Sequence, residues 1–316
     1  MPIPAIIALS VGGFLIFTVL SIFFSLTYAT SRATLKGAPK AVDPYDGIDA
    51  EKFASAKELL VSRIDTLVAE KYETVSIKSR DGLTLYARYY HKCDGAPLHI
   101  MVHGYRSTPL RDFTGAGCEA LAEGHNLLLI HQRATYPSTG RSVAFGDKEK
   151  YDLEDWIKYA LDRFGDIDIV VMGMSMGGAT VLLASELELP ENVRCIIADC
   201  PFSSAEEEIR LVTEREGLPR FGYFFIRIGA RLYGRVNLDR ARASEAVKNA
   251  RFPILILHGE DDRLVPLEMG QKIYDACTSE KKIVTFPGAR HATSYLSDPD
   301  RYVKELKDFY KKYLRD

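Results

Sequence analysis

Ser175 has the sequence context of a catalytic nucleophile. It is the centre of residues 173–177 (GMSMG), which follow a short apolar run and precede an apolar segment of helical length. A G-x-S-x-G pattern between a strand and a helix forms a sharp turn that presents the serine hydroxyl at the edge of a sheet. Glycine is needed two residues to either side because the turn leaves no space for a side chain there. The pattern therefore predicts that Ser175 attacks an acyl carbon, next to a helix N-terminus whose dipole favours developing negative charge.

A serine hydroxyl needs a general base, and that base needs an acid to orient it. In sites of this kind the acid and then the histidine follow the serine in the chain. His291 comes after the last apolar run, and residues 260–262 (EDD) come after the run before it. The carboxyl ends of parallel strands meet at one edge of a sheet, so both positions should lie beside Ser175. We predict that His291 is the general base and that an acid from 260–262 holds its ring.

Two backbone amides should stabilise the oxyanion that forms during acyl transfer. One belongs to the residue after the nucleophile, Met176, and the other to the loop after the apolar run at 98–102. That loop begins with residues 103–105 (HGY), and Tyr105 is the expected second donor. The sequence has neither a CxxC pair nor an HExxH motif, so we expect neither a metal nor a cofactor.

The elements that must position these residues alternate between strand and helix. Short apolar runs predict strands at 98–102, 127–131, 167–172, 193–198, 253–258 and 282–286. Helical periodicity falls between and after them, at 110–123, 147–164, 177–187, 267–276 and 300–314. This alternation predicts an α/β fold with a mostly parallel sheet and helices on both faces. A hairpin over 73–90 should add an antiparallel edge.

Residues 201–252 contain helical patterns and no predicted strand. So long a stretch exceeds a simple connection, and we predict a small helical cap inserted at about 203–251. The alternative is a set of extra helices packed on the sheet without a role at the site. Residues 222–233 (GYFFIRIGARLY) could line an acyl chain, contact a membrane or form an ordinary helix core.

The N-terminal part of the chain is uncharged: residues 1–31 contain no Asp, Glu, Lys or Arg. The apolar stretch at 3–29 is long enough to cross a bilayer, which favours a single transmembrane anchor over a cleaved signal peptide or a buried core helix. Arg32, Lys36 and Lys40 follow the span, so the positive-inside rule places the remainder in the cytoplasm. A cleaved signal would instead mean an exported protein.

The remaining composition is that of an ordinary folded protein. The 316 residues are 47% hydrophobic and 27% charged, which excludes a disordered chain, and the formal net charge of -2 gives no basic field for nucleic acid. Five irregularly spaced cysteines indicate reduced thiols rather than a disulfide framework. We therefore predict an anchor at 1–31, a linker with an amphipathic helix at 32–71, and one catalytic domain at 72–316.

From about residue 72 to 314 the chain resembles a serine hydrolase of the α/β-hydrolase superfamily. It is similar to the branch of dipeptidyl-peptidase-like and acylaminoacyl-peptidase-like hydrolases and carboxylesterases. The motifs that carry this resemblance are HGY at 103–105, HQRATYPSTGRS at 131–142, GMSMGG at 173–178, HGEDDRLVP at 258–266 and GARH at 288–291. The resemblance implies that Asp262 is the acid, and Asp199 is the fallback position. In the second motif His131 stands where relatives have an acid, and residues 134–137 replace a small turn at the border of the site.

These observations lead to a functional hypothesis. We expect a membrane-anchored serine hydrolase, carboxylesterase-like or lipase-like, that cleaves carboxylic esters through an acyl-enzyme formed on Ser175. Its partners would be a small-molecule ester or acyl substrate, including lipid-derived ones, and the membrane, with no nucleic acid. A peptidase or acyltransferase could use the same triad, and a non-catalytic membrane-tethered binding module is the remaining alternative.

Overall fold

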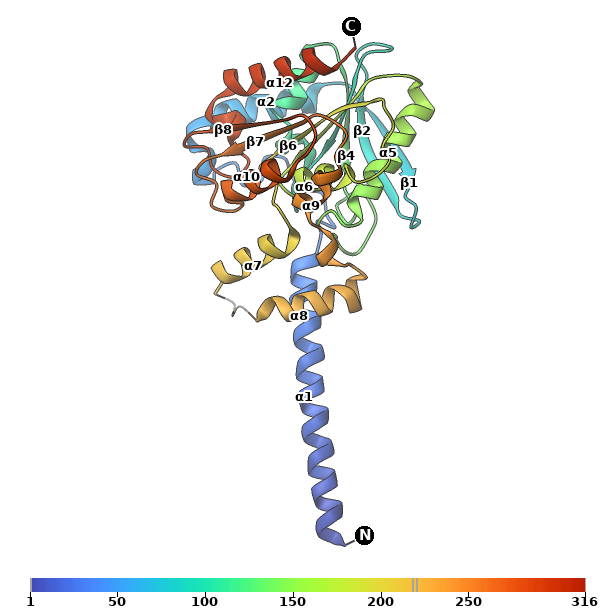
Figure 1. The fold of residues 1–316 in the computed structure, drawn as a ribbon, viewed down its shortest axis with the longest axis vertical. Helices are drawn as coiled ribbons and strands as arrows, with labels where there is room; N and C mark the ends of the chain where they lie inside the picture. The colour runs from blue at the N-terminus through green and yellow to red at the C-terminus, as the bar shows by residue number, and fades with distance from the viewer. Residues whose placement is uncertain (1, 218, 220, 316) are drawn as a thin grey trace.

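The protein is built around one mixed sheet of eight strands, in the order β1-β2-β4-β3-β5-β6-β7-β8. We describe it from a computed structural model that covers residues 2–217, 219 and 221–315 (Figure 1). β2 runs antiparallel to β1 and to β4, and all other neighbouring strands are parallel. The strands are β1 (Glu73–Lys78), β2 (Thr84–Tyr90), β3 (Leu98–Val102), β4 (Asn126–His131), β5 (Ile169–Met174), β6 (Val193–Asp199), β7 (Ile254–Gly259) and β8 (Lys281–Phe286). The predicted α/β-hydrolase fold, with its antiparallel N-terminal hairpin, is confirmed.

Helices cover both faces of this sheet, as the doubly buried strands require. Side chains of β5 alternate between two core clusters: Ile169 and Val171 face one, and Val170 and Met172 face the other. The first face is covered by α5 (Glu149–Phe164), α6 (Met176–Ala184), α9 (Ala243–Ala246) and α10 (Leu267–Ala276). The second is covered by α2 (Lys57–Ala69), α3 (Pro109–Asp112), α4 (Ala116–Ala122), α11 (Ser294–Ser297) and α12 (Pro299–Tyr313).

Two predicted helices are divided in the structure. The amphipathic helix expected within 32–71 forms a 3-10 turn, η1 (Glu51–Ala56), followed by α2. The pattern at 110–123 divides into α3 and α4, with Gly115 between them. Position 115 requires glycine, because the ring of Tyr295 occupies the space where a Cβ would lie. Glycine also weakens a helix at that point.

Between β6 and β7 the described residues form helices and no strand. They are α7 (Ala205–Arg215), α8 (Gly222–Gly229), a π-helical turn η2 (Ala230–Gly234), and 3-10 turns η3 (Leu238–Arg240) and η4 (Val247–Asn249) on either side of α9. α9 packs on the sheet face beside α6 and α10. α7 and α8 lie away from the sheet, on the side from which the N-terminal helix projects (Figure 1).

The N-terminal apolar stretch forms one long helix, α1 (Ile3–Leu35), which projects from the body (Figure 1). By length and composition, its segment Ser10–Leu35 is the one candidate membrane span among the described residues. This agrees with an anchor or a signal sequence. α1 continues through the expected boundary at 31/32, and the division into 1–31, 32–71 and 72–316 stays a prediction.

The C-terminal turns of α1 are part of the folded body. Thr27, Ser31 and Leu35 are buried, whereas most of the preceding side chains are exposed. The hydroxyl of Tyr105 donates to the backbone oxygen of Thr34 over 2.8 Å. Thr27, Ser31 and Leu35, at four-residue spacing, therefore form the face of α1 that contacts the body.

Candidate active site

Ser175 lies on a strained turn between β5 and α6. Its φ of 54° and ψ of -113° are unusual for a residue with a side chain. A Cβ at Gly173 would collide with the backbone of Gly177, and a Cβ at Gly177 would collide with the carbonyl of Val102. The close approach of these backbones therefore requires both glycines of the pattern, and the turn leaves the Ser175 hydroxyl at the carboxyl edge of the sheet.

His291 and Asp262 lie in line with this hydroxyl. The Nε2 atom of His291 is 3.0 Å from Oγ of Ser175, and its Nδ1 atom is 2.7 Å from Oδ2 of Asp262. Asp262 is buried in the loop after β7, where its Oδ1 accepts the backbone N–H groups of Leu264 and Val265, both at 2.9 Å. These hydrogen bonds fix the carboxylate, which in turn orients the histidine ring.

The alternative acids lie elsewhere. Glu260 and Asp261 are exposed. Asp199 is buried at the end of β6, and its carboxylate accepts hydrogen bonds from the hydroxyls of Tyr302 (2.9 Å) and Ser294 (3.3 Å). Burial raises the pKa of Asp199 to about 7. Of the four carboxylates, Asp262 is the one that the structure brings to His291.

The loop after β3 packs directly against the turn that carries Ser175. A Cβ at Gly104 would lie 3.5 Å from that of Ser175, so the loop that carries the expected oxyanion donor Tyr105 lies against Ser175. The loop is held by Asp112, whose Oδ2 accepts the N–H of Gly104 over 2.7 Å. Met176 is the first residue of α6, so its N–H has no partner in a preceding helical turn. Sequence reasoning did not find Asp112, because its role depends on a contact across the loop.

Two of the other histidines near the site have structural hydrogen bonds. His103 accepts the N–H of Gln132 at Nε2 (3.1 Å), so its Nδ1 donates to the carbonyl of Gly104 (2.7 Å). His258 contacts the carbonyl of Val265 over 2.9 Å. His131, at the end of β4, is half-buried, its Nδ1 has no hydrogen-bond partner among the described residues, and desolvation lowers its pKa to about 3. His103 and His258 are therefore built into the fold.

Cys200, Asp262 and His291 form the single group of potential metal ligands within the described residues. Burial keeps the pKa of Cys200 well above its usual value, so the sulfur is a protonated thiol. A thiol is a poor metal ligand, and the two other members already contact each other. The arrangement fits an acid-base pair better than a metal site.

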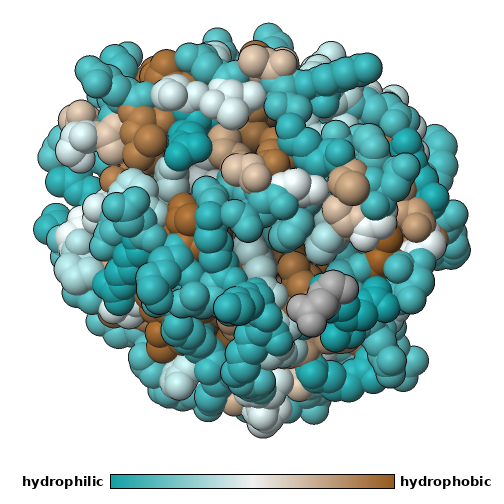
Figure 2. All heavy atoms as spheres, turned by 90° about the horizontal axis from the view of Figure 1, so that it is seen from above, coloured by the Kyte–Doolittle hydropathy of each residue, from teal (hydrophilic) through white to brown (hydrophobic). Residues whose placement is uncertain are grey.

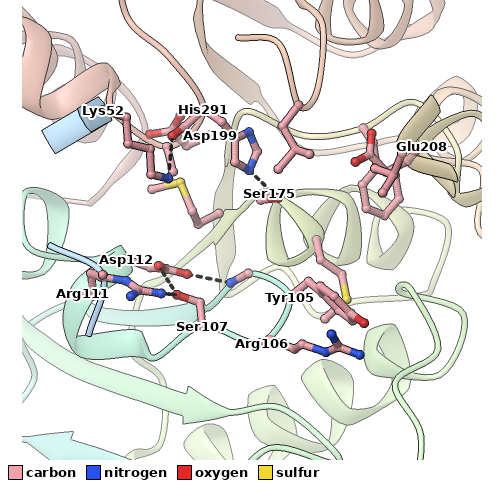
Figure 3. Close-up of a pocket in the computed structure, with 18 of the residues that line it drawn as sticks. Lys52, Tyr105, Arg106, Ser107, Arg111, Asp112, Ser175, Asp199, Glu208 and His291 are labelled. Carbon is pink, nitrogen blue, oxygen red and sulfur yellow. Dashed lines mark hydrogen bonds between the residues drawn. The ribbon is translucent and has the colours of Figure 1, made fainter. Parts of the chain in front are cut away.

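Ser175 lies in a cavity of about 850 Å³. Figure 3 shows Lys52 and Arg111 on one side of the serine and Glu208 on the other. The cavity is lined by both polar and apolar side chains, the apolar ones including Phe53, Tyr105, Phe145, Phe202, Ile209, Val212, Leu264 and Leu296. Residues 222–233 do not line it, so an acyl-lining role for that segment is not supported.

Lys52 places its amino group beside His291. It comes from η1, and its Nζ donates to the backbone oxygen of His291 over 3.3 Å. Burial lowers the pKa of Lys52, and within the part of the chain that the structure describes no carboxylate forms an ion pair with it. Arg111 lies on the same side and donates to the carbonyl of Asp46 and to Ser107. Lys52 is far from the motifs in sequence, so no spacing pattern could have found it.

Glu208 extends from α7 into the opposite side of the cavity. It is 7% exposed, and its Oε2 atom has no hydrogen-bond partner among the described residues. Burial raises the pKa of Glu208 to about 8, with Asp262 as a second cause, so the side chain is mostly a neutral carboxylic acid at pH 7. It can therefore donate a hydrogen bond to a ligand.

The N-terminal helix also forms part of the cavity wall. Ala33 and Thr34, in the last turn of α1, line the cavity beside Tyr105 and Arg106. The guanidinium of Arg106 donates to the backbone oxygens of Ala33 (2.6 Å) and Lys36 (2.8 Å). This contact could not be predicted from the sequence, because the composition of an apolar stretch does not show which residues its end will contact.

The fold is that of the α/β-hydrolases. Residues 142–316, more than half of the chain, match the model of the prolyl oligopeptidase family. The chain belongs to that family.

The chain is similar to proteins from bacteria and vertebrates, and its fold is similar to that of an archaeal esterase. The chain is 25% identical over 194 residues to the uncharacterized protein YqkD of Bacillus subtilis, covering 59% of this chain and 62% of that one. It is 28% identical over 207 residues to lysophosphatidylserine lipase ABHD12 of Danio rerio, covering 62% and 52%. The match thus spans between half and two thirds of these relatives. The structure of the Pyrococcus furiosus esterase Pf2001 superposes with a TM-score of 0.66 at 21% identity, covering 89% of this chain and 99% of that one, and shows the fold.

Proposed function

We propose that the protein is a serine esterase with Ser175, His291 and Asp262 as its catalytic triad. The observation that carries this proposal is the continuous line of hydrogen bonds from Asp262 through His291 to Ser175, inside a cavity large enough for a substrate. Membership of a hydrolase family and the esterase-like relatives support it.

The proposed reaction follows the geometry. Ser175 Oγ attacks the acyl carbon while Nε2 of His291 takes the hydroxyl proton, and Asp262 stabilises the resulting imidazolium. The N–H groups of Met176 and Tyr105 bind the oxyanion, each worth about 10²–10³ in rate. His291 then gives its proton to the leaving alcohol. Water, activated by the same nitrogen, attacks the acyl-enzyme and releases the acid.

We infer that the substrate is an acyl ester whose alcohol part carries a negative charge. The apolar side chains of the cavity suit an acyl chain, and Lys52 offers a cation without an ion-pair partner among the described residues. A relative is named a lysophosphatidylserine lipase, which acts on a substrate of this chemistry. Lipid-derived esters are therefore the substrate class that we favour.

The test of the triad is active-site labelling. The full chain in detergent should react with a fluorophosphonate probe and hydrolyse p-nitrophenyl butyrate, and Ser175→Ala should abolish both. Ser62→Ala removes an exposed serine of α2 and serves as the matched control. Equal labelling or turnover by Ser175→Ala would exclude Ser175 as the nucleophile.

Peptide-bond hydrolysis is the second candidate, since the matched family is named for an oligopeptidase. The same triad can attack an amide if His291 protonates the leaving amine. Comparison of an aminoacyl p-nitroanilide with the corresponding p-nitrophenyl ester separates the two activities. A kcat/KM for the amide that equals or exceeds that for the ester would identify a peptidase.

We propose that α1 is a retained membrane anchor with the catalytic domain on the cytoplasmic side. The docked face of α1 supports retention, because cleavage near Ala29 would remove the buried Thr27 and leave the partners of that helix uncovered. The positive charges after the span support the orientation. The protein should remain with membranes after washing with sodium carbonate, at its full length, and recovery of a shortened soluble form would contradict this.

A further inference from the structure

Helix α8 has apolar side chains on two opposite faces. The face toward the body belongs to the main core cluster and is formed by Tyr223, Ile226 and Ala230. The opposite face carries Phe221, Phe224 and Leu232, which are 68%, 52% and 55% exposed. Large apolar side chains clustered at the surface of a protein indicate a surface that meets an apolar partner.

This exposed face adjoins α1. α8 lies across α1 where that helix leaves the body (Figure 1). A Cβ at Gly229 would collide with the backbone oxygen of Thr27, so the two helices touch at their backbones. The ring of Phe23 is 5.8 Å from that of Phe225. The exposed side chains of α8 are thus continuous with the apolar surface of α1.

The free length of α1 matches the thickness of a bilayer. The helix begins at Ile3, and the ring of Phe23 packs against those of Phe224 and Phe225 on α8. About 20 residues precede that contact, and at 1.5 Å per residue they extend about 30 Å. The hydrocarbon core of a bilayer is also about 30 Å thick. If residues 3–22 span this core, α8 lies at the level of the lipid headgroups.

The charged side chains on α8 and η2 are arranged as expected for helices at the level of the lipid headgroups. On α8 and η2, Arg227 and Arg231 pair with Asp239 of η3, and by helical spacing they stand between the two apolar faces. The opposite pole of the molecule is covered mainly by hydrophilic side chains with small apolar spots (Figure 2). Away from α1, α8 and η2, the large apolar side chains exposed among the described residues are scattered: Val68, Tyr72, Tyr136 and Leu264.

We propose that α8 and η2 lie in the lipid–water interface of the leaflet from which the body emerges, with Phe221, Phe224 and Leu232 inserted among the acyl chains. Aromatic side chains and an in-plane amphipathic helix are favoured at this depth. The inference rests on the proposal that α1 crosses the membrane. The partner of this face is a lipid surface.

Interfacial seating of α8 places the active site close to the lipid. Thr34 lines the cavity and stands 11 residues after Phe23, which is about 16 Å along the helix. Val212 and Thr213 of α7, shortly before α8, line the same cavity. A lipid with one acyl chain could reach Ser175 from the leaflet with only part of its length withdrawn from the membrane.

The test is depth-dependent fluorescence quenching of the full chain in phosphatidylcholine vesicles. Phe224→Trp places a reporter on the proposed contact face, and Val68→Trp places one at an exposed site on α2. The native Trp156 is buried and contributes equally to both. Lipids brominated at acyl positions 6 and 7 should quench the Phe224→Trp reporter and shift its emission to the blue, and should leave the Val68→Trp signal unchanged.

Each other outcome overturns the proposal in an identifiable way. Water-like emission from Phe224→Trp without quenching would place the face in solvent. Blue-shifted emission without quenching would mean that protein covers it, for example a second copy of the chain. Phe17→Trp tests the underlying anchor: quenching of this reporter alone would refute the interfacial helix, and quenching of neither would refute the anchor as well. Fluorophosphonate labelling of the same vesicles reports separately on the esterase proposal.

Discussion

The position of Lys52 in the candidate site is visible in the structure but could not be predicted from the sequence. Its ammonium group is half-buried next to His291, contacts a carbonyl oxygen and has no ion-pair partner in the described part of the chain. A partly buried cation loses solvation free energy, and this loss is offset only when an anion pairs with the cation. A negatively charged substrate would provide that anion.

We therefore predict that Lys52→Met changes substrate preference. The kcat/KM for a monoacyl glycerophosphate ester should fall about tenfold or more, which corresponds to the loss of one charged hydrogen bond. The kcat/KM for the uncharged monoacylglycerol with the same acyl chain should stay nearly constant, and Lys52→Arg should restore part of the loss. An equal fall for both substrates would show that Lys52 supports the fold and not recognition.

We predict that Glu208 makes the stability of the protein depend on pH. Its pKa of about 8 lies above the ordinary glutamate value of about 4.3, so the folded state holds the proton more tightly than the unfolded state does. The stability that this proton contributes is complete below about pH 4 and is lost as the pH rises toward 8. Glu208→Gln keeps a neutral side chain of the same shape at every pH.

The expected result is a higher thermal unfolding midpoint for Glu208→Gln than for the parent at pH 8.5, by about 2–4 °C for each kcal/mol regained. The difference should shrink toward pH 5. Circular dichroism of the full chain in detergent measures it, with the exposed Glu188→Gln as control. Asp199 and Asp152, whose pKa values are also raised by burial, are common to all the proteins compared. A pH-independent difference would contradict the shifted pKa.

At the scale of elements, the contact between α1 and α8 depends on the absence of one side chain. Gly229 lets α8 approach the backbone of α1 at Thr27. Gly229→Ala would force the helices apart, and overpacking of this kind typically costs about 1–3 kcal/mol. Gly12→Ala is the matched control, because no atom lies within 4 Å of the added carbon at that position.

We expect Gly229→Ala to lower the thermal midpoint by several degrees and to speed proteolysis between α7 and α8. Gly12→Ala should leave both unchanged or slightly improve them, since alanine favours helix. Limited proteolysis followed by mass spectrometry locates the opened segment. If both variants behaved alike, α1 and α8 would not be packed together in solution.

At the scale of the whole molecule, the fold and the hydrogen-bonded line from Asp262 through His291 to Ser175 could be predicted from the sequence, for separate reasons. Alternating apolar runs and helical patterns require a parallel sheet between helices, and chain order alone put candidates at its carboxyl edge. Asp262 could be chosen among three neighbouring acids only through a family resemblance, whereas the structure distinguishes them by burial and direction.

The remaining parts of the site depend on contacts between distant segments. Lys52 reaches His291 across 239 positions, and Tyr105 reaches Thr34 across 71. No spacing pattern in the sequence predicts either contact. The apolar stretch at 3–29 predicts a membrane span, but it does not show whether the end of that helix packs against the catalytic domain. Only the structure shows that this end lines the cavity.

The hydrogen bond from Tyr105 to the last turn of α1 has a mechanical consequence. A spanning helix tilts when its apolar length exceeds the thickness of the hydrocarbon core, and a helix that is too short causes the bilayer around it to become thinner. Tilt of α1 would be transmitted to the loop whose amide is proposed to bind the oxyanion. If α1 spans the membrane and the protein is an esterase, as proposed, turnover of a water-soluble ester should therefore vary with the acyl-chain length of the host lipid and be fastest where hydrophobic mismatch is smallest.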